Sequence, residues 1–185
     1  MVTYRLMAGM LSVKNQKYPT QTAWNNHLES LYHLQIGTSL STFQDRYELT
    51  VRMRHVPGEM VQAPGLMDHA LEALESLLMH PHFDEKSLAQ EKRFLKDEWA
   101  TKKASKGFQA IRHLTEAMLL DHPYYVPQVQ DDATIESVTL PMIKDAYARF
   151  MAAPRVLIRL GQSDPLVGPE FLKNKKKPSS LLTFE

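Results

Sequence analysis

The sequence predicts an α+β fold in which helices pack on one face of an antiparallel sheet. Apolar residues recur at helical spacing through most of the chain. One stretch breaks this pattern, because Tyr47, Leu49, Val51 and Met53 alternate with polar residues. Such alternation is typical of a half-buried antiparallel strand with one wet face. A weaker alternating stretch precedes it, so the two stretches together predict a hairpin.

The N-terminal third is expected to hold two helices followed by this hairpin. Tyr18 and Pro19 separate the two helical patterns, and Thr20 or Thr22 supplies an N-cap for the second. The expected elements are helices over residues 3–13 and 21–32 and strands over residues 34–40 and 47–53, with a turn near residues 43–45.

The remaining two thirds are expected to be mainly helical. Asp84 and Thr139 are suitable N-caps, and Gly107 is expected to interrupt the helical pattern. The expected elements are helices over residues 66–79, 85–104, 108–120 and 140–152 and a strand over residues 155–160. We expect residues 1–164 to form one domain and residues 165–185, which include three prolines, to form a linker or tail.

Composition excludes several classes of function. The chain has 185 residues, a net charge of +1 and no cysteine, so thiol catalysis, disulfide scaffolds and cysteine-bound zinc are excluded. The balanced charge gives no support for nucleic-acid binding. No apolar run reaches the roughly 18 residues of a membrane span, and no secretory signal is visible. We therefore expect a cytoplasmic protein that binds neither nucleic acid nor membrane.

Histidine and acidic residues provide the remaining candidates for chemistry. His69 with Glu72 and His113 with Glu116 have His-x-x-Glu spacing, but a zinc helix of this type needs a second histidine where alanine stands. Each pair is therefore expected to be a surface pair, since catalytic zinc needs three protein ligands. His80 and His82 flank a proline, where a helix end is the expected role. Among the acids of the helix over 85–104, Glu98 lies nearest the apolar stripe.

Several stretches, in their order and spacing, resemble the pitrilysin/insulinase-like metallopeptidase family, which includes the mitochondrial processing peptidase subunits. These stretches are Leu11–Thr20, Leu28–Tyr32, Tyr47–Met53, Leu74–Phe83, Gln90–Arg93, Asp121–Tyr124 and Val156–Gly161. The resemblance covers about residues 4–164. It is greatest to a non-catalytic bacterial branch associated with 5-aminopentanol modification of elongation factor P.

The resemblance implies that the zinc site of active relatives is degenerate here. Their His-x-x-Glu-His motif falls on residues 5–9, where Arg5 and Gly9 replace the two ligand histidines and Ala8 replaces the general base. The third ligand of the family matches Glu98. One carboxylate alone cannot hold zinc or activate its water. We therefore expect no zinc, no catalytic residue and an ion pair between Arg5 and Glu98.

Three functions are consistent with these features of the sequence. The first is a catalytically inactive peptidase-like domain that acts as a structural or peptide-holding partner, beside an active or inactive peptidase-like paralogue, and that holds an extended peptide by strand addition. The second is a zinc metallopeptidase with a rearranged site that uses Glu98 with His69 or His113. The third is an adaptor in elongation factor P modification.

The resemblance also implies that the domain lacks its first strands, because family domains open with two or three strands before the first helix. An N-terminally truncated domain of this kind would leave a sheet edge exposed. Exposed edges invite pairing with another chain. On this basis we expect self-association.

Overall fold

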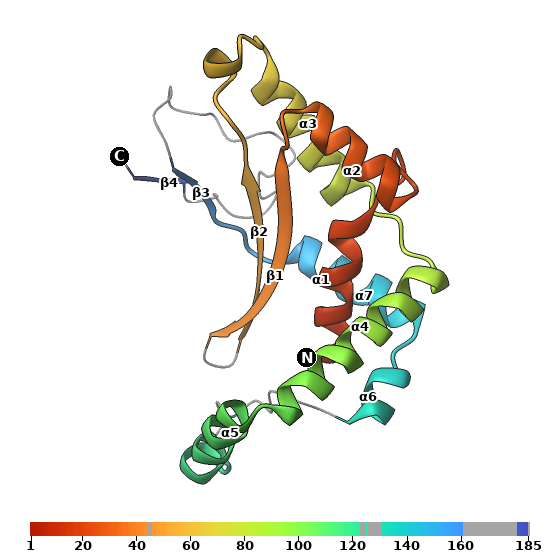
Figure 1. Cartoon of the computed structure of the whole chain (residues 1–185), viewed down its shortest axis with the longest axis vertical. Coiled ribbons are helices and arrows are strands. Elements are labelled where there is room, and N and C mark those ends of the chain that lie inside the picture. The colour runs from red at the N-terminus through yellow and green to blue at the C-terminus, as the bar shows by residue number, and fades with distance from the viewer. Residues whose placement is uncertain (44–45, 123–124, 126–130, 161–180, 185) are drawn as a thin grey trace.

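The computed structural model describes residues 1–43, 46–122, 125, 131–160 and 181–184 (Figure 1). Helices and one hairpin make up most of this part of the chain. The helices are α1 (Val2–Val13), α2 (Gln21–Ser30), the short 3-10 helix η1 (Gly58–Val61), α3 (Leu66–Met79), α4 (Glu85–Ala104), α5 (Lys106–Leu119), α6 (Asp132–Glu136) and α7 (Leu140–Ala152). The strands are β1 (Gln35–Phe43), β2 (Arg46–Arg54), β3 (Leu157–Leu160) and β4 (Leu181–Phe184).

The β1–β2 hairpin turns one face toward the helices (Figure 1), and alternate residues on its other face are exposed. The strands are antiparallel, with Thr38 opposite Val51 and Leu40 opposite Leu49. Apolar side chains of the inner face pack toward α1, α3 and α7, whereas outward residues such as Arg52 and Arg54 are exposed. This arrangement confirms the predicted α+β class and the predicted wet face of the strand.

Helix α1 lies at the centre of the packing. Its apolar side chains join those of α4, α6 and α7 in the main core, which includes Met7, Trp99, Ile135 and Ile143 with no more than 1% of their surface exposed. The Thr38 hydroxyl donates a 2.6 Å hydrogen bond to the Ala8 carbonyl and so connects β1 to the same helix. Burial on several sides explains why α1 is apolar over most of its circumference.

A second core holds α2 against α3. Trp24 on α2 is buried against Ala70, Ala73 and Leu77 on α3. The predicted cap of α2 is confirmed, because the Thr20 hydroxyl accepts a 3.2 Å hydrogen bond from the Ala23 amide. This cap satisfies one of the free amides of the first turn.

The structure corrects some predicted boundaries and elements. The break between α4 and α5 falls at Ser105, whose hydroxyl caps α5 by accepting from the Phe108 amide, and Gly107 lies inside α5. Thr139 occupies the N-cap position of α7, but its side chain makes no capping hydrogen bond. Leu181–Phe184, expected to belong to a tail, pairs in parallel with β3.

Two short helices, η1 and α6, did not show in the periodicity because each is too short for an apolar repeat. The turn predicted near residues 43–45 falls largely outside the described residues, as do most of the loop over 121–127 and most of the predicted tail. Among the helices of the described residues, none combines the length and the apolar character needed to cross a membrane.

Candidate functional site

Residues 5–9 of α1, which the resemblance matches to the zinc motif, lie against α4. The Arg5 guanidinium donates from Nη2 to both carboxylate oxygens of Glu98, at 2.6 and 2.5 Å. The predicted ion pair is therefore confirmed. The two side chains are 35% and 39% exposed, so solvent screens the pair and its expected contribution to stability is below about 1 kcal/mol.

A second cation completes this cluster. Lys102, one helical turn after Glu98, places its Nζ 2.7 Å from Glu98 Oε1. Partial burial opposes ionisation of Glu98, but the hydrogen bonds from Lys102 and Arg5 outweigh it and hold the Glu98 pKa below its usual value. Glu98 is consequently ionised at neutral pH and paired with two cations, Arg5 and Lys102.

The remaining two positions of the motif carry no donor atom that binds a metal. Ala8 is buried, and Gly9 lies beneath the side chain of Glu91 on α4. A methyl group on Gly9 would lie 2.9 Å from the Glu91 carboxyl carbon, and closer still to its Oε2. Glycine at this position therefore leaves the space that the Glu91 carboxyl group fills.

Glu91 differs from Glu98 in having no compensating charge. Within the described part of the chain, no hydrogen bond or ion pair is formed by its carboxyl group. Burial raises the pKa of Glu91 above its usual value. Glu91 and Glu98 both face α1 from the same helix, but their pKa values are shifted in opposite directions. Neighbouring cations lower the pKa of Glu98, and burial raises the pKa of Glu91.

These residues do not fit a zinc site. Zinc in proteins takes three or four nitrogen, sulfur or carboxylate ligands at about 2.0–2.3 Å. The positions that the resemblance assigns to the zinc ligands provide a guanidinium, a hydrogen atom and one carboxylate already bound by that guanidinium. No group of three histidine, aspartate or glutamate side chains in the described residues is arranged to hold a metal ion.

The other histidine candidates are dispersed. His69 Nδ1 lies 3.6 Å from Glu72 Oε2 on the exposed side of α3, as expected of a surface pair. On α5, Glu116 pairs with Arg112 rather than with His113. The described residues therefore do not bring Glu98 together with His69 or His113 as the rearranged zinc site requires.

His80 and His82 lie near the C-terminal end of α3 and before α4, and His82 Nε2 is 3.3 Å from Asp84 Oδ2. This contact places His82 beside the N-cap of α4, so the predicted helix-end position is correct for this pair.

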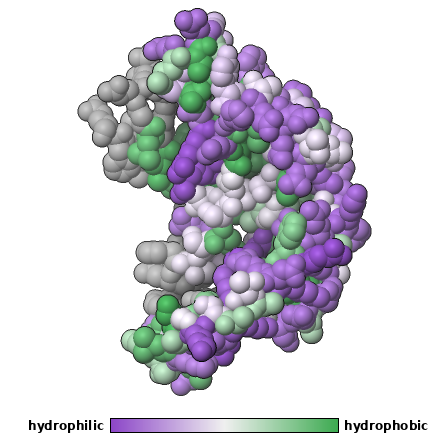
Figure 2. Space-filling view, viewed as in Figure 1, coloured by the Kyte–Doolittle hydropathy of each residue, from purple (hydrophilic) through white to green (hydrophobic). Residues whose placement is uncertain are grey.

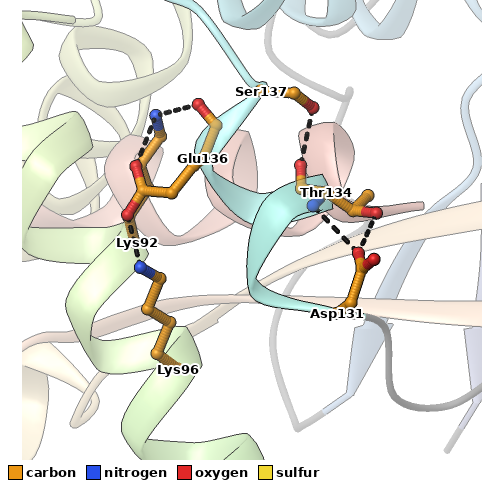
Figure 3. Close-up of polar contacts among 6 residues, drawn as sticks. All are labelled: Lys92, Lys96, Asp131, Thr134, Glu136 and Ser137. Carbon is orange, nitrogen blue, oxygen red and sulfur yellow. Dashed lines mark hydrogen bonds and ion pairs between the residues drawn. The ribbon is translucent and has the colours of Figure 1, made fainter.

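A pocket of about 310 Å³ lies between α4 and α6, and Figure 3 shows three of its lining residues, Lys92, Lys96 and Glu136, together with the polar contacts inside α6. Lys92 donates a 2.9 Å hydrogen bond to the Glu136 carbonyl, and Lys96 forms an ion pair with the Glu136 carboxylate. The Asp131 carboxylate caps α6 by accepting from the Thr134 amide at 2.9 Å. Glu136 thus offsets one of the two lysine charges, and these contacts hold α6 against α4.

A smaller pocket of about 210 Å³ lies between α2 and α3. The ring of His27 stacks on Tyr18 with centroids 4.3 Å apart. Burial, and after it the charge of Lys17, lower the His27 pKa, whereas Glu72 acts in the opposite direction. A neutral imidazole stacked on a phenol ring is a packing contact here, and sequence periodicity gave no signal for it.

Comparison with known proteins supports the fold but assigns no function to it. No protein-family model matches the sequence, and no curated protein has a significant match. Among solved structures, the chain is similar to one titled as a conserved protein from Enterococcus faecalis V583, with a TM-score of 0.72 and 18% sequence identity. The match covers 82% of this chain and 37% of that chain, so this chain spans little more than a third of its length. At this identity the similarity shows the fold alone.

Proposed function

We propose that this chain is a catalytically inactive zinc-peptidase-like domain that serves as a structural or peptide-holding partner of another peptidase-like chain. The observation that carries the proposal is the contact of Arg5 Nη2 with both carboxylate oxygens of Glu98. A guanidinium held at 2.5 Å takes up the carboxylate that the resemblance assigns to zinc. The pair joins the same two helices that a shared metal would join.

The reaction of the family needs a water molecule that a metal activates and a base that accepts its proton. Ala8 stands at the matching base position and has no titratable group. Glu91 has a raised pKa, but its carboxyl group packs over Gly9, a position with no side chain that could hold a metal. These residues support a binding role rather than hydrolysis.

The hairpin supports the peptide-holding part of the proposal. In the described residues β1 and β2 pair only with each other, so each strand keeps one edge of free amide and carbonyl groups. An extended peptide can add to such an edge through main-chain hydrogen bonds. The bond from Thr38 to the Ala8 carbonyl places β1 beside the degenerate motif.

The test measures zinc and hydrolysis in the same preparation. Elemental analysis of the purified chain is expected to find far less than one zinc ion per chain before and after dialysis against a chelator. Cleavage of an unfolded protein substrate is expected to be indistinguishable from a buffer control, with or without EDTA. Stoichiometric zinc that the chelator removes, together with EDTA-sensitive cleavage, would refute the proposal.

Peptide binding needs its own measurement. A fluorescently labelled extended peptide is expected to show saturable anisotropy, and the same peptide with alternate backbone amides N-methylated is expected to bind more weakly, because it cannot donate to a strand edge. Equal binding of the two peptides would contradict strand addition and leave only the structural role.

A further inference from the structure

Helix α5 turns apolar side chains toward solvent. Ile111 and Leu114 are each 61% exposed, Met118 is 71% exposed, and α5 has no buried residue. Their spacing of three and four residues places them on one side of the helix. Three exposed small residues share that side. We define the α5 apolar face as Gly107, Ala110, Ile111, Leu114, Ala117 and Met118.

Several polar residues of α5 are engaged with their own chain. Arg112 Nε lies 3.4 Å from Glu116 Oε1, and the Tyr125 hydroxyl donates to the same glutamate oxygen at 3.3 Å. Gln109 donates to the Lys103 carbonyl at 2.9 Å. A surface helix normally has the opposite polarity, with its apolar side toward the body of the protein.

Figure 2 shows apolar residues gathered at the lower left of the molecule, where Figure 1 places α5. Helix α5 projects away from the hairpin and packs only on α4 among the stronger element contacts of the described residues. A contiguous apolar surface of this kind on a projecting helix marks an interaction site.

The charges at the two ends of α5 indicate the partner. Lys106 stands at the first position of the helix and Asp121 lies just after its last, and both are exposed. Neither forms an ion pair with another described residue. Leu114 lies eight residues after Lys106 and seven residues before Asp121. A second α5 in antiparallel orientation, with a two-fold axis near Leu114, therefore brings each lysine opposite Asp121 of the partner subunit.

We propose that the α5 apolar face is the contact surface between two copies of this chain, which pair as antiparallel helices about a two-fold axis. A two-fold interface uses the same patch twice, so a helix with a cation at one end and an anion at the other is self-complementary. The small residues Gly107, Ala110 and Ala117 allow the two helices to approach closely. We place the contact on α5 rather than on the edge of the β1–β2 hairpin, because the complementary charges Lys106 and Asp121 flank the apolar face of α5.

The first test substitutes the centre of the face. Sedimentation velocity over a wide concentration range is expected to show a concentration-dependent dimer for the natural chain. Leu114→Glu is expected to weaken the dimer about a hundredfold or more, because it buries two unpaired carboxylates at the axis. Met60→Glu is the matched control, since Met60 is 79% exposed on η1 and is expected to leave the dimer unchanged. Far-ultraviolet circular dichroism checks that each variant is folded.

The second test uses the symmetry. Lys106→Glu and Asp121→Lys are each expected to weaken the dimer several-fold, because like charges then face each other twice. A mixture of the two single variants is expected to restore it, since both contacts of the mixed dimer then join opposite charges. A different partner protein on this face predicts a monomer at every concentration and no rescue on mixing.

Either of two results overturns the proposal. The first is a natural chain that stays monomeric. The second is a dimer that survives Leu114→Glu, which is the result expected if the chains pair through the β1–β2 edge instead. The proposal is independent of the proposed function, because loss of the dimer leaves the zinc and hydrolysis measurements unchanged.

Discussion

The Lys14 ammonium lies 2.6 Å from the Asp84 carboxylate and so joins the end of α1 to the start of α4. Lys14 is buried, with 11% of its side chain exposed. Close by, the Gln16 amide donates to the His80 carbonyl at 2.8 Å, which connects the segment after α1 to the C-terminal end of α3, just before α4. These contacts fix α1 relative to α4 and thereby set the separation of the helices that carry Arg5 and Glu98.

Asp84→Ala is expected to destabilise the protein by about 2–4 kcal/mol. The carboxylate accepts from the Ser87 amide at 2.7 Å, and loss of an N-cap removes about 1 kcal/mol. The buried Lys14 ammonium also loses its partner, which adds about 1–3 kcal/mol. Asp84→Asn keeps the cap acceptor and is expected to have a smaller effect. Urea unfolding measures both, and equal stabilities for the two variants would contradict this division.

The same carboxylate makes stability depend on pH. Burial opposes ionisation of Asp84, but hydrogen bonds from Lys14 and Ser87 and the charge of Lys14 outweigh it and hold the Asp84 pKa well below its usual value. This stabilisation is therefore complete above the unfolded pKa of about 4 and is lost as the pH falls toward the folded pKa. Urea unfolding at a series of acidic pH values is expected to show a shallower loss of stability in Asp84→Asn than in the natural chain.

Glu91→Gln is expected to stabilise the protein at neutral pH. Because burial raises the Glu91 pKa, the folded state binds the proton more tightly than the unfolded state, and ionisation disfavours folding. The gain should appear as the pH rises from the unfolded to the folded pKa of Glu91 and should vanish at lower pH.

Glu98→Gln is the matched control on the same helix and is expected to have the opposite sign. The Glu98 pKa is lowered, so its stabilisation is present above the unfolded pKa and is lost as the pH falls. Urea unfolding of both variants at neutral and acidic pH checks the signs. If Glu91→Gln instead lowers the stability at neutral pH, the Glu91 carboxylate is stabilised by a favourable interaction, and the desolvation argument is wrong.

The parts of this fold that could be predicted from sequence are those where periodicity and capping agree. The alternation from Tyr47 to Met53 located β2, and the Asp84 cap located α4. Reading the motif on α1 together with Glu98 also predicted a contact between residues 93 positions apart. That inference came from the family resemblance, because nothing in local sequence indicates which residues of α1 face α4.

The remaining features depend on tertiary contacts that leave no local pattern. Glu136 binds Lys92 and Lys96 across about 40 residues of sequence, and α6 is too short to show a repeat. Gly107 was expected to break a helix, but Ser105 supplies both the end of α4 and the cap of α5, so glycine is tolerated inside the first turn. The sequence shows the apolar side of α5 as a helical repeat of apolar residues. Such a repeat usually indicates a stripe that faces the core, and it does not reveal that this stripe is exposed in the folded chain.

Restoring two histidines is expected to create a zinc site. Arg5 and Gly9 are four residues apart, so Arg5→His and Gly9→His place two imidazoles on one face of α1, beside Glu98. Removal of Arg5 also frees the Glu98 carboxylate from one of its two cations. The Glu91 side chain must rotate away from position 9, which its flexible end allows. Isothermal titration with zinc is expected to show one tight site in the double variant and none in the natural chain.

The control for this variant tests the geometry rather than the presence of histidine. Adding Glu98→Gln to the double variant removes the third ligand and leaves both imidazoles, so zinc binding should weaken about 10- to 100-fold or more, as it does when a group that supports a metal site is lost. Hydrolysis is not expected to return, because Ala8 leaves the double variant without a general base. If zinc binds equally well with glutamine at position 98, the metal is held by α1 alone. The correspondence between Glu98 and the family's third ligand would then be wrong, even though the ion pair with Arg5 is present.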